Sequence, residues 1–370
     1  MKILLVNKLY YPWIGGVETV TKDIAEGLQS VGFKTEVLAC VPKGDSKEEI
    51  AGGVPVHKAS SIGIYLGMPI SFDFFLKFKN YIQSTDILFI QHPFPLATIA
   101  HLLFAREKPT VIWYHADIER QKIANFFFAP FLTMSLRRAK KIFVASRNTM
   151  QHSRYLKPFH EKCSIIPFGI DAARFKDSPE VLSAAELIKK QFGESIVLSV
   201  GRLVPYKGYE YLIKAMKNVP ANLLIVGSGG LRSELESIAK REGLSKKVFF
   251  IDSVSDPIPY YFACDLFVLP SIYKTEAFGV VQLEAMACGR AVINTSLPTG
   301  VPEVSIGGET GYTVPPRDVG ALREAIAAII GDSSLRGKFG AAARKRALGV
   351  FSKENFIDSL RKELASIEPY

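Results

Sequence analysis

The sequence predicts an α/β protein with two Rossmann-like domains facing a central cleft. Two observations support this prediction: a strand, a glycine loop and a helix open the chain, and the same pattern restarts near residue 193. Each repeat is typical of parallel sheets that carry helices on both faces. A length of 370 residues also suits two domains.

The first repeat begins with the aliphatic run 2–6, which is typical of a buried parallel strand. A loop containing Gly15 and Gly16 follows. Apolar residues then recur at helical spacing until Gly32, where glycine predicts the helix end. Further strands in this half are predicted at 36–41, 87–91, 110–114, 141–145 and 164–166.

The second repeat has its own strand–loop–helix start. A strand at 196–200 leads through a Gly-Arg loop into a helix at about 208–218. The segment around 171–185 has the character of a linker, so we expect the domains to cover 1–180 and 190–350. Further strands are predicted at 222–226, 248–251, 266–269 and 291–294.

Composition and charge exclude several classes of protein. The 48% hydrophobic content excludes a disordered chain, and four widely spaced cysteines predict neither a disulfide framework nor a zinc site. No apolar run reaches the ~18 residues of a spanning helix or resembles a signal peptide. We therefore expect a cytoplasmic protein with peripheral membrane contact at most.

The net charge of +10 predicts a surface that attracts anions. Residues 1–185 hold 23 basic and 16 acidic side chains, a net +7, whereas the remainder nets +3. Nucleotides, acidic lipids and nucleic acid are the candidate partners. A nucleic-acid binder should carry a concentrated basic stripe, which the sequence lacks, so we do not expect nucleic acid to bind.

Two loops carry candidate ligand-binding residues. Arg202 and Lys207 flank the loop after strand 196–200, and a guanidinium fork with an ammonium suits a diphosphate. Gly15 and Gly16 precede a helix, where glycine lets a ligand approach the backbone. The alternatives are solvated surface charges for the first pair and a tight turn with positive φ for the second.

Residues 276–289 form the most informative segment. Glu276 comes just before a predicted helix, and Glu284 lies more than one turn inside it. Glu276 suits sugar hydroxyls, Glu284 suits the two hydroxyls of a ribose, and the amides of Phe278 and Gly279 suit phosphate. The alternative makes Glu276 a partner of the helix dipole and Glu284 a solvated residue.

His115 ends the strand at 110–114, and Asp117 follows it. The carboxyl end of a strand is where a doubly wound sheet presents reactive side chains. A structural histidine is the alternative interpretation.

Taken together, these segments resemble the family-4 retaining glycosyltransferases of the GT-B type. The resemblance spans nearly the whole chain and rests on the motifs Gly15-Gly16-Val17-Glu18, Tyr114-His115-Ala116-Asp117, Ile166-Pro167-Phe168-Gly169-Ile170-Asp171, Val200-Gly201-Arg202 with Lys207-Gly208, Val226-Gly227-Ser228-Gly229, Cys264-Asp265-Leu266 with Leu269-Pro270-Ser271, and Glu276 to Gly289.

The resemblance implies an acceptor domain, completed by the C-terminal helix 351–370, and a nucleotide-sugar donor domain. It implies that Arg202 and Lys207 hold the donor diphosphate and that Glu284 binds the ribose. It also implies that Gly16 brings amides to the phosphate and that His115 lies near the reacting sugar carbon. Glu276 would contact the donor sugar, supported by the Phe278 and Gly279 amides.

The resemblance also bears on the donor and the reaction. The family commonly has glycine where this chain has Ala277, a small change that bears on sugar preference. Tyr114 and Asp117 around His115 are similar to O-antigen mannosyltransferases, which favours GDP-mannose as donor and a glycan or lipid-linked acceptor. The alternatives are a UDP-sugar-dependent transferase or a GT-B-type sugar-nucleotide epimerase.

The expected chemistry needs no cofactor or metal, since the two cations can stabilise the leaving diphosphate. No pair of carboxylates suited to a retaining glycosidase's double displacement can be identified, which favours front-face attack. Two aromatic-basic stretches, 72–79 and 125–141, predict either core helices or a surface that binds anionic membranes.

Overall fold

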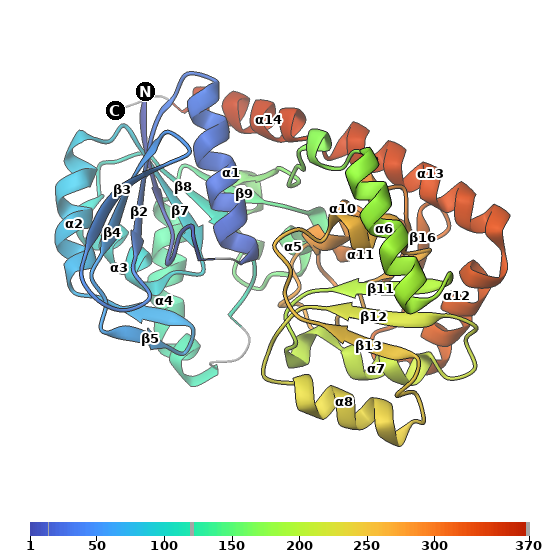
Figure 1. Ribbon diagram of the computed structural model, residues 1–370. Helices are drawn as coiled ribbons and strands as arrows, with labels where there is room; N and C mark the ends of the chain where they lie inside the picture. Colours follow the sequence, from blue (N-terminus) through green and yellow to red (C-terminus); the bar gives the residue numbers. More distant parts are fainter. Residues whose placement is uncertain (14, 119–121, 368–370) are drawn as a thin grey trace. The chain divides into compact units, whose positions relative to one another are not determined.

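The computed structural model describes residues 1–13, 15–118 and 122–367 (Figure 1). The chain divides into two compact units, one of Met1–Phe168 with Glu354–Tyr370 and the other of Gly169–Lys353. The last three residues of the C-terminal helix expected at 351–370 lie outside the described residues. No helix in the described ranges combines the length and apolar character needed to cross a bilayer.

Unit 1 contains a sheet in the order β10-β9-β8-β7-β1-β2-β4-β3, parallel except where β3 pairs with β4. The connections run outward in opposite directions from β1 and β7, so the switch point of the sheet lies between these strands. The strands are β1 (Lys2–Val6), β2 (Lys34–Cys40), β3 (Lys47–Ala51), β4 (Val54–Ala59), β7 (Ile87–His92), β8 (Thr110–Tyr114), β9 (Lys141–Val144) and β10 (Cys163–Ile165), with a separate hairpin of β5 (Gly63–Tyr65) and β6 (Met68–Ile70).

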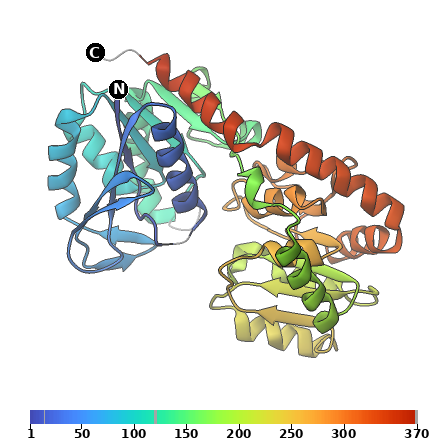
Figure 2. The same cartoon turned by 45° about the horizontal axis from the view of Figure 1, so that its top comes forward.

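Helices cover both faces of this sheet (Figures 1 and 2). On one face, α2, α3 and α4 contribute Phe74, Ala97 and Leu132 to a core with Ile90 of β7. On the other, Phe356 of α14 packs edge-on against Trp113 of β8 at 5.7 Å between ring centroids. The helical elements are α1 (Gly16–Ser30), α2 (Asp73–Tyr81), η1 (Ile82–Ser84), α3 (Pro95–Phe104), α4 (Lys122–Arg138), α5 (Arg147–His152), η2 (Lys157–Lys162) and α14 (Lys353–Ala365).

Unit 2 contains a parallel sheet in the order β13-β12-β11-β14-β15-β16. Its strands are aliphatic because helices bury them from both sides. The switch point lies between β11 and β14. The strands are β11 (Ile196–Val200), β12 (Asn222–Val226), β13 (Val248–Ile251), β14 (Leu266–Val268), β15 (Ala291–Thr295) and β16 (Gly311–Val314).

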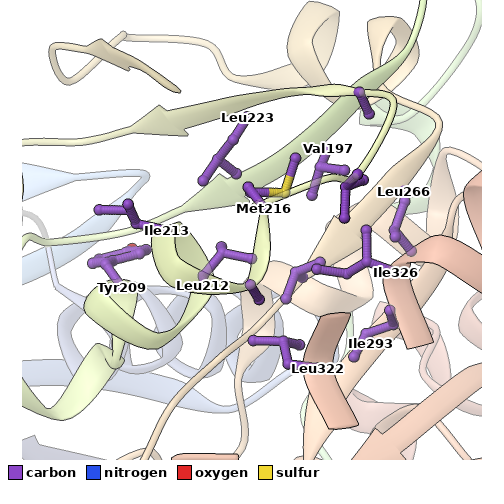
Figure 3. Packing of buried hydrophobic residues seen from close by; sticks show 14 of the residues in the cluster. Val197, Tyr209, Leu212, Ile213, Met216, Leu223, Leu266, Ile293, Leu322 and Ile326 are labelled. Carbon is purple, nitrogen blue, oxygen red and sulfur yellow. The ribbon is translucent and has the colours of Figure 1, made fainter. Parts of the chain in front are cut away.

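Figure 3 shows the core on one face of this sheet, where Leu212 and Met216 approach Val197 and Leu223 of the strands. Ile326 of α12 belongs to the same cluster and lies beside Leu266. The helical elements of unit 2 are η3 (Ala172–Arg174), α6 (Pro179–Phe192), η4 (Pro205–Lys207), α7 (Tyr209–Ala215), α8 (Arg232–Arg241), α9 (Ile258–Ala263), α10 (Val280–Ala287), α11 (Val301–Val304), α12 (Val319–Gly331) and α13 (Ser333–Val350).

The linker expected at 171–185 is wrong over its second half, because α6 begins at Pro179. Ser178 caps this helix by accepting a hydrogen bond from the Val181 amide at 3.3 Å, and proline suits the first helical position.

Two other elements differ from the predictions. Strand β3 was not predicted, because its polar sequence lacks the alternation of apolar residues that is typical of a strand. The helix expected at 208–218 ends at Ala215, and Asn218 has a positive φ of 65°.

Candidate active site

Two loops meet at the switch point of the unit 2 sheet. One follows β11 and carries Arg202 and Lys207, and the other follows β14 and carries Glu276. Open α/β sheets bind their ligands outside the carboxyl ends of the strands at such a point. The topology therefore brings three of the predicted residues to one edge of one sheet.

The two loops are packed backbone to backbone at Gly208. This residue has a φ of 67°, and a Cβ atom there would lie 2.2 Å from the carbonyl oxygen of Pro270. Glycine is therefore required both by conformation and by space. The close approach lets Lys207, the preceding residue, reach the second loop.

Lys207 and Glu276 form a buried ion pair. The Lys207 ammonium lies 2.6 Å from Oε2 of Glu276, and the two side chains are only 8% and 11% exposed. The Ser271 hydroxyl donates to the same carboxylate oxygen at 2.8 Å. Burial is the largest influence on the pKa of Lys207 and lowers it, but the Glu276 carboxylate, together with Tyr209 and Tyr206, more than offsets burial, so the pKa is raised. The lysine therefore carries a fixed positive charge.

Arg202 differs from Lys207 because its side chain is exposed. The structure thus separates the two cations predicted on this loop: one is buried and held by a carboxylate, and the other faces solvent. Exposed arginine can turn its fork toward an incoming anion.

The turn into α10 is shaped by Phe278 and Gly279. Phe278 is buried and packs edge-on against Phe351 at 6.0 Å between ring centroids. Gly279 caps the helix with a φ of 72°, and a Cβ there would lie 2.5 Å from Leu269. Ala277 accepts a hydrogen bond from the Gly300 amide at 2.8 Å. The ring of Phe278 is thus an anchor, so any ligand contact at 278 belongs to the backbone.

A buried amide network, which the motifs did not reveal, holds this turn. Gln282 donates to the Phe278 carbonyl at 2.9 Å, and Asn294 donates to the Gln282 side-chain oxygen at 3.1 Å. Thr313 donates to Asn294 in turn. One feature of the sequence could have indicated this network, namely a glutamine within the otherwise apolar start of α10. A polar side chain buried among apolar residues needs hydrogen-bond partners.

Glu284 is partly buried, which excludes its interpretation as a solvated helix residue. The hydroxyl of the buried Tyr261 donates to Oε2 of Glu284 at 2.6 Å. Burial raises the pKa of this carboxyl, although the Tyr261 hydrogen bond and Arg174 oppose that shift. Tyr261, which the sequence reading missed, therefore orients the carboxylate assigned to a ribose.

In unit 1, Gly15 and Gly16 begin α1 at the switch-point edge of the sheet. Gly15 is extended, with φ of −169°, so the tight turn with positive φ is wrong. A Cβ on Gly16 would meet nothing within 4 Å. The chain itself therefore does not require glycine at 16, whereas at Gly15 a Cβ would lie 2.2 Å from the Glu18 carboxylate, which covers that part of the helix start.

His115 follows β8 at the same edge of unit 1 and is buried. Its Nε2 lies 2.7 Å from the side-chain oxygen of Gln91, and its ring stacks on Trp113 and Phe168. Burial, with smaller contributions from His92 and Lys8, lowers the pKa of His115 to about 3. The ring is therefore neutral, with the proton on Nε2 donated to Gln91.

A second network braces the loop that carries His115. Asp117 accepts hydrogen bonds from the Tyr114 hydroxyl and the Ser153 hydroxyl, both at 2.6 Å. His92, which sequence reading missed, ends β7 and stacks on Tyr114 at 4.6 Å. Within the described residues neither ring nitrogen of His92 has a hydrogen-bond partner, although the side chain is buried.

The ten predicted residues thus form two sets. Glu276, Ala277, Phe278, Gly279, Glu284, Arg202 and Lys207 lie in unit 2, and Gly15, Gly16 and His115 lie in unit 1. Over the residues that the structure describes, no three His, Cys, Asp or Glu side chains gather as a metal-binding group.

Comparison with known proteins identifies both halves of the chain. Residues 14–174 match the family described as Glycosyltransferase Family 4, and residues 184–346 match Glycosyl transferases group 1. The chain is 30% identical to a D-rhamnosyltransferase, WbpZ, of Pseudomonas aeruginosa, over 88% of this chain and 86% of that protein.

Two further relatives agree. O-antigen chain mannosyltransferase C of Escherichia coli is 28% identical over 97% of this chain and 96% of that protein. The crystal structure of Anabaena HepE in complex with UDP superposes with a TM-score of 0.82 at 22% identity, covering 99% of this chain and all of that one. With the two Rossmann-like units, these matches show that the chain belongs to the GT-B glycosyltransferases of family 4 and group 1.

Proposed function

We propose that this glycosyltransferase moves a mannosyl group from GDP-mannose to a glycan or lipid-linked acceptor of a cell-surface polysaccharide, with retention of configuration. The observation that carries the proposal is the buried Lys207–Glu276 pair at the switch point of unit 2. Similarity to an O-antigen mannosyltransferase supports the sugar and the acceptor class. The UDP complex of HepE supports nucleotide binding by this fold and makes a UDP-sugar the second candidate.

The leaving group is a nucleoside diphosphate, whose negative charge grows as the sugar–phosphate bond breaks. We assign Lys207 and Arg202 to this charge, together with the amides at the start of α10. Glu276 is held in place by Lys207 and Ser271 and accepts hydrogen bonds from the hydroxyls of the donor sugar. Glu284 is held in place by Tyr261 and accepts hydrogen bonds from the ribose hydroxyls. Because these partners hold both carboxylates before the donor arrives, donor binding loses less entropy.

The acceptor hydroxyl attacks the anomeric carbon from the face that the diphosphate leaves. The new bond joins the acceptor oxygen to that carbon, the carbon–phosphate oxygen bond breaks, and the proton passes to the departing phosphate. His115 is neutral, so it serves this step as a hydrogen-bond partner rather than as a cation. An NMR spectrum of the product should show the donor's anomeric configuration; inversion would refute the front-face route.

Donor identity is tested by thermal unfolding in the presence of GDP- and UDP-sugars. GDP-mannose should raise the melting temperature most, because a ligand that binds only the folded state stabilises it. Glu284→Gln should reduce that shift for every nucleotide sugar. A larger shift with UDP-sugars would reassign the donor, and isomerisation of the sugar nucleotide without an acceptor would make the protein an epimerase.

Sugar transfer should persist in excess EDTA. The reason is that Lys207, Arg202 and the start of α10 supply the positive charge that the leaving diphosphate requires. The measurement is product formation with and without EDTA. Loss of transfer that magnesium or manganese restores would contradict this account of leaving-group stabilisation.

His115→Ala should lower kcat by about 10²-fold with little change in the KM for donor, because its contact strengthens during transfer. The kcat of the native protein should show no titration of this ring between pH 5 and 8, since its pKa is about 3. His101→Gln is the matched control. His101 is another buried histidine of unit 1, but it bonds Ser135 within the helical layer. Unchanged kinetics in folded His115→Ala would make His115 structural.

A further inference from the structure

A stripe of exposed apolar side chains runs along α4. Phe127, Phe131 and Met134 follow one another at helical i, i+4, i+7 spacing, and Phe127 is 69% exposed. Phe126 beside them is 76% exposed, whereas Leu132 on the opposite face is buried in the core of unit 1. The helix therefore has two apolar faces, and in the described structure the core covers one of them.

Positive charge lies at the end of this stripe. Arg137 and Arg138 are exposed in the last turn of α4, and Arg138 donates to the Leu102 carbonyl at 2.9 Å, which holds its guanidinium at the surface. Residues 120–160 contain nine Lys or Arg and no Asp or Glu. Phenyl rings and a run of basic residues thus occur together on one segment, although Lys141 at its far end forms an ion pair with Glu363.

Neighbouring helices extend the apolar character of this side of unit 1. Helix α3 packs against both α2 and α4, and all three cover the same face of the sheet (Figures 1 and 2). Phe72 at the start of α2 is 83% exposed, and Leu76 and Leu103 are exposed as well. The other aromatic-basic stretch is partly core, since Phe74 and Phe78 of α2 are fully buried.

We propose that the outward face of α2, α3 and α4 docks on the surface of an anionic lipid bilayer. The phenyl rings of α4 lie at the boundary between headgroups and acyl chains, and Arg137 and Arg138 meet the lipid phosphates. Interfacial helices combine large apolar side chains with Lys or Arg in this way. A second copy of the chain is a poorer occupant, because a two-fold contact would bring the same cations together. The inference is independent of the donor sugar.

The test is flotation of the full chain with vesicles of phosphatidylcholine alone or with added phosphatidylglycerol. Binding should favour the anionic vesicles and weaken in high salt. The variant Phe127→Ser/Phe131→Ser/Met134→Ser should bind at least ~10-fold more weakly because it loses three interfacial side chains. Arg137→Gln/Arg138→Gln should lose about five-fold per arginine. The control Leu182→Ser/Leu187→Ser removes two exposed leucines from α6 of unit 2 and should bind normally.

Circular dichroism confirms that each variant is folded, and the arginine variant changes only exposed side chains. Equal or negligible binding of the native chain to both kinds of vesicle would overturn the proposal. So would a control that weakens binding as much as the α4 variants. A dimer in solution that the triple α4 variant converts to monomer would instead assign this face to a second copy of the chain.

Discussion

Lys207→Ala is expected to lower kcat/KM for the donor by about 10²–10³-fold. The substitution removes the buried ammonium assigned to the leaving diphosphate and leaves the Glu276 carboxylate without its cation. Because a buried charge without a partner is costly, unfolding of unit 2 should also become easier by about 3–5 kcal/mol. Steady-state kinetics and chemical denaturation measure the two effects.

A second substitution separates catalysis from stability. Lys207→Met/Glu276→Leu removes both charges, so stability should largely return while activity stays lost. The control is Lys214→Ala, since Lys214 forms a 3.7 Å pair with Glu210 in which both side chains are well exposed. That variant should change stability by less than ~1 kcal/mol. If the double variant recovers transfer as well as stability, the pair is structural and the diphosphate site lies elsewhere.

Unit 1 is expected to lose stability steeply as the pH falls from about 6.5 toward 4. Burial is the main reason why the pKa values of His92 and His115 are lowered to about 3. Burial, and to a smaller extent Arg138, lowers the pKa of His101 to about 4. Above pH 6.5 these rings are neutral in both states, and folding is insensitive to them. Below it the unfolded chain binds protons that the folded unit cannot accept, which favours unfolding.

The expected loss of unfolding free energy is 1.36 kcal/mol for each pH unit below the unfolded pKa of about 6.5. At pH 5 this amounts to about 2 kcal/mol for each histidine and roughly 6 kcal/mol for the three. Denaturant titrations at pH 7 and pH 5 measure the loss, with circular dichroism as the signal. His101→Gln removes one of the three titrating rings and should therefore flatten the dependence by about a third. Equal stability at both pH values would show that these rings accept protons in the folded protein.

The sequence by itself determined the fold class and predicted that the residues of the candidate donor site lie mainly in the second half of the chain. Buried parallel strands are continuous aliphatic runs, so their positions along the chain could be predicted, and with them the loops that follow each strand. Gly208 and Gly279 also carried a readable signal, because positive φ and close backbone approach demand glycine. Arg202 and Lys207 were thereby predicted on a loop at the carboxyl edge of a sheet, and Glu276 just before a helix that follows another strand.

Only the tertiary structure decided how those residues are held. Lys207 and Glu276 are far apart in the chain, and their pairing depends on two loops packing at Gly208. The partners Tyr261 for Glu284 and Gln91 for His115 come from other elements, so no local pattern announces them. The neutral state of His115 and the exposed face of α4 have the same origin. The burial of a residue depends on every element that packs around it. Most of those elements are distant in the chain, so the local sequence does not show how buried the residue is.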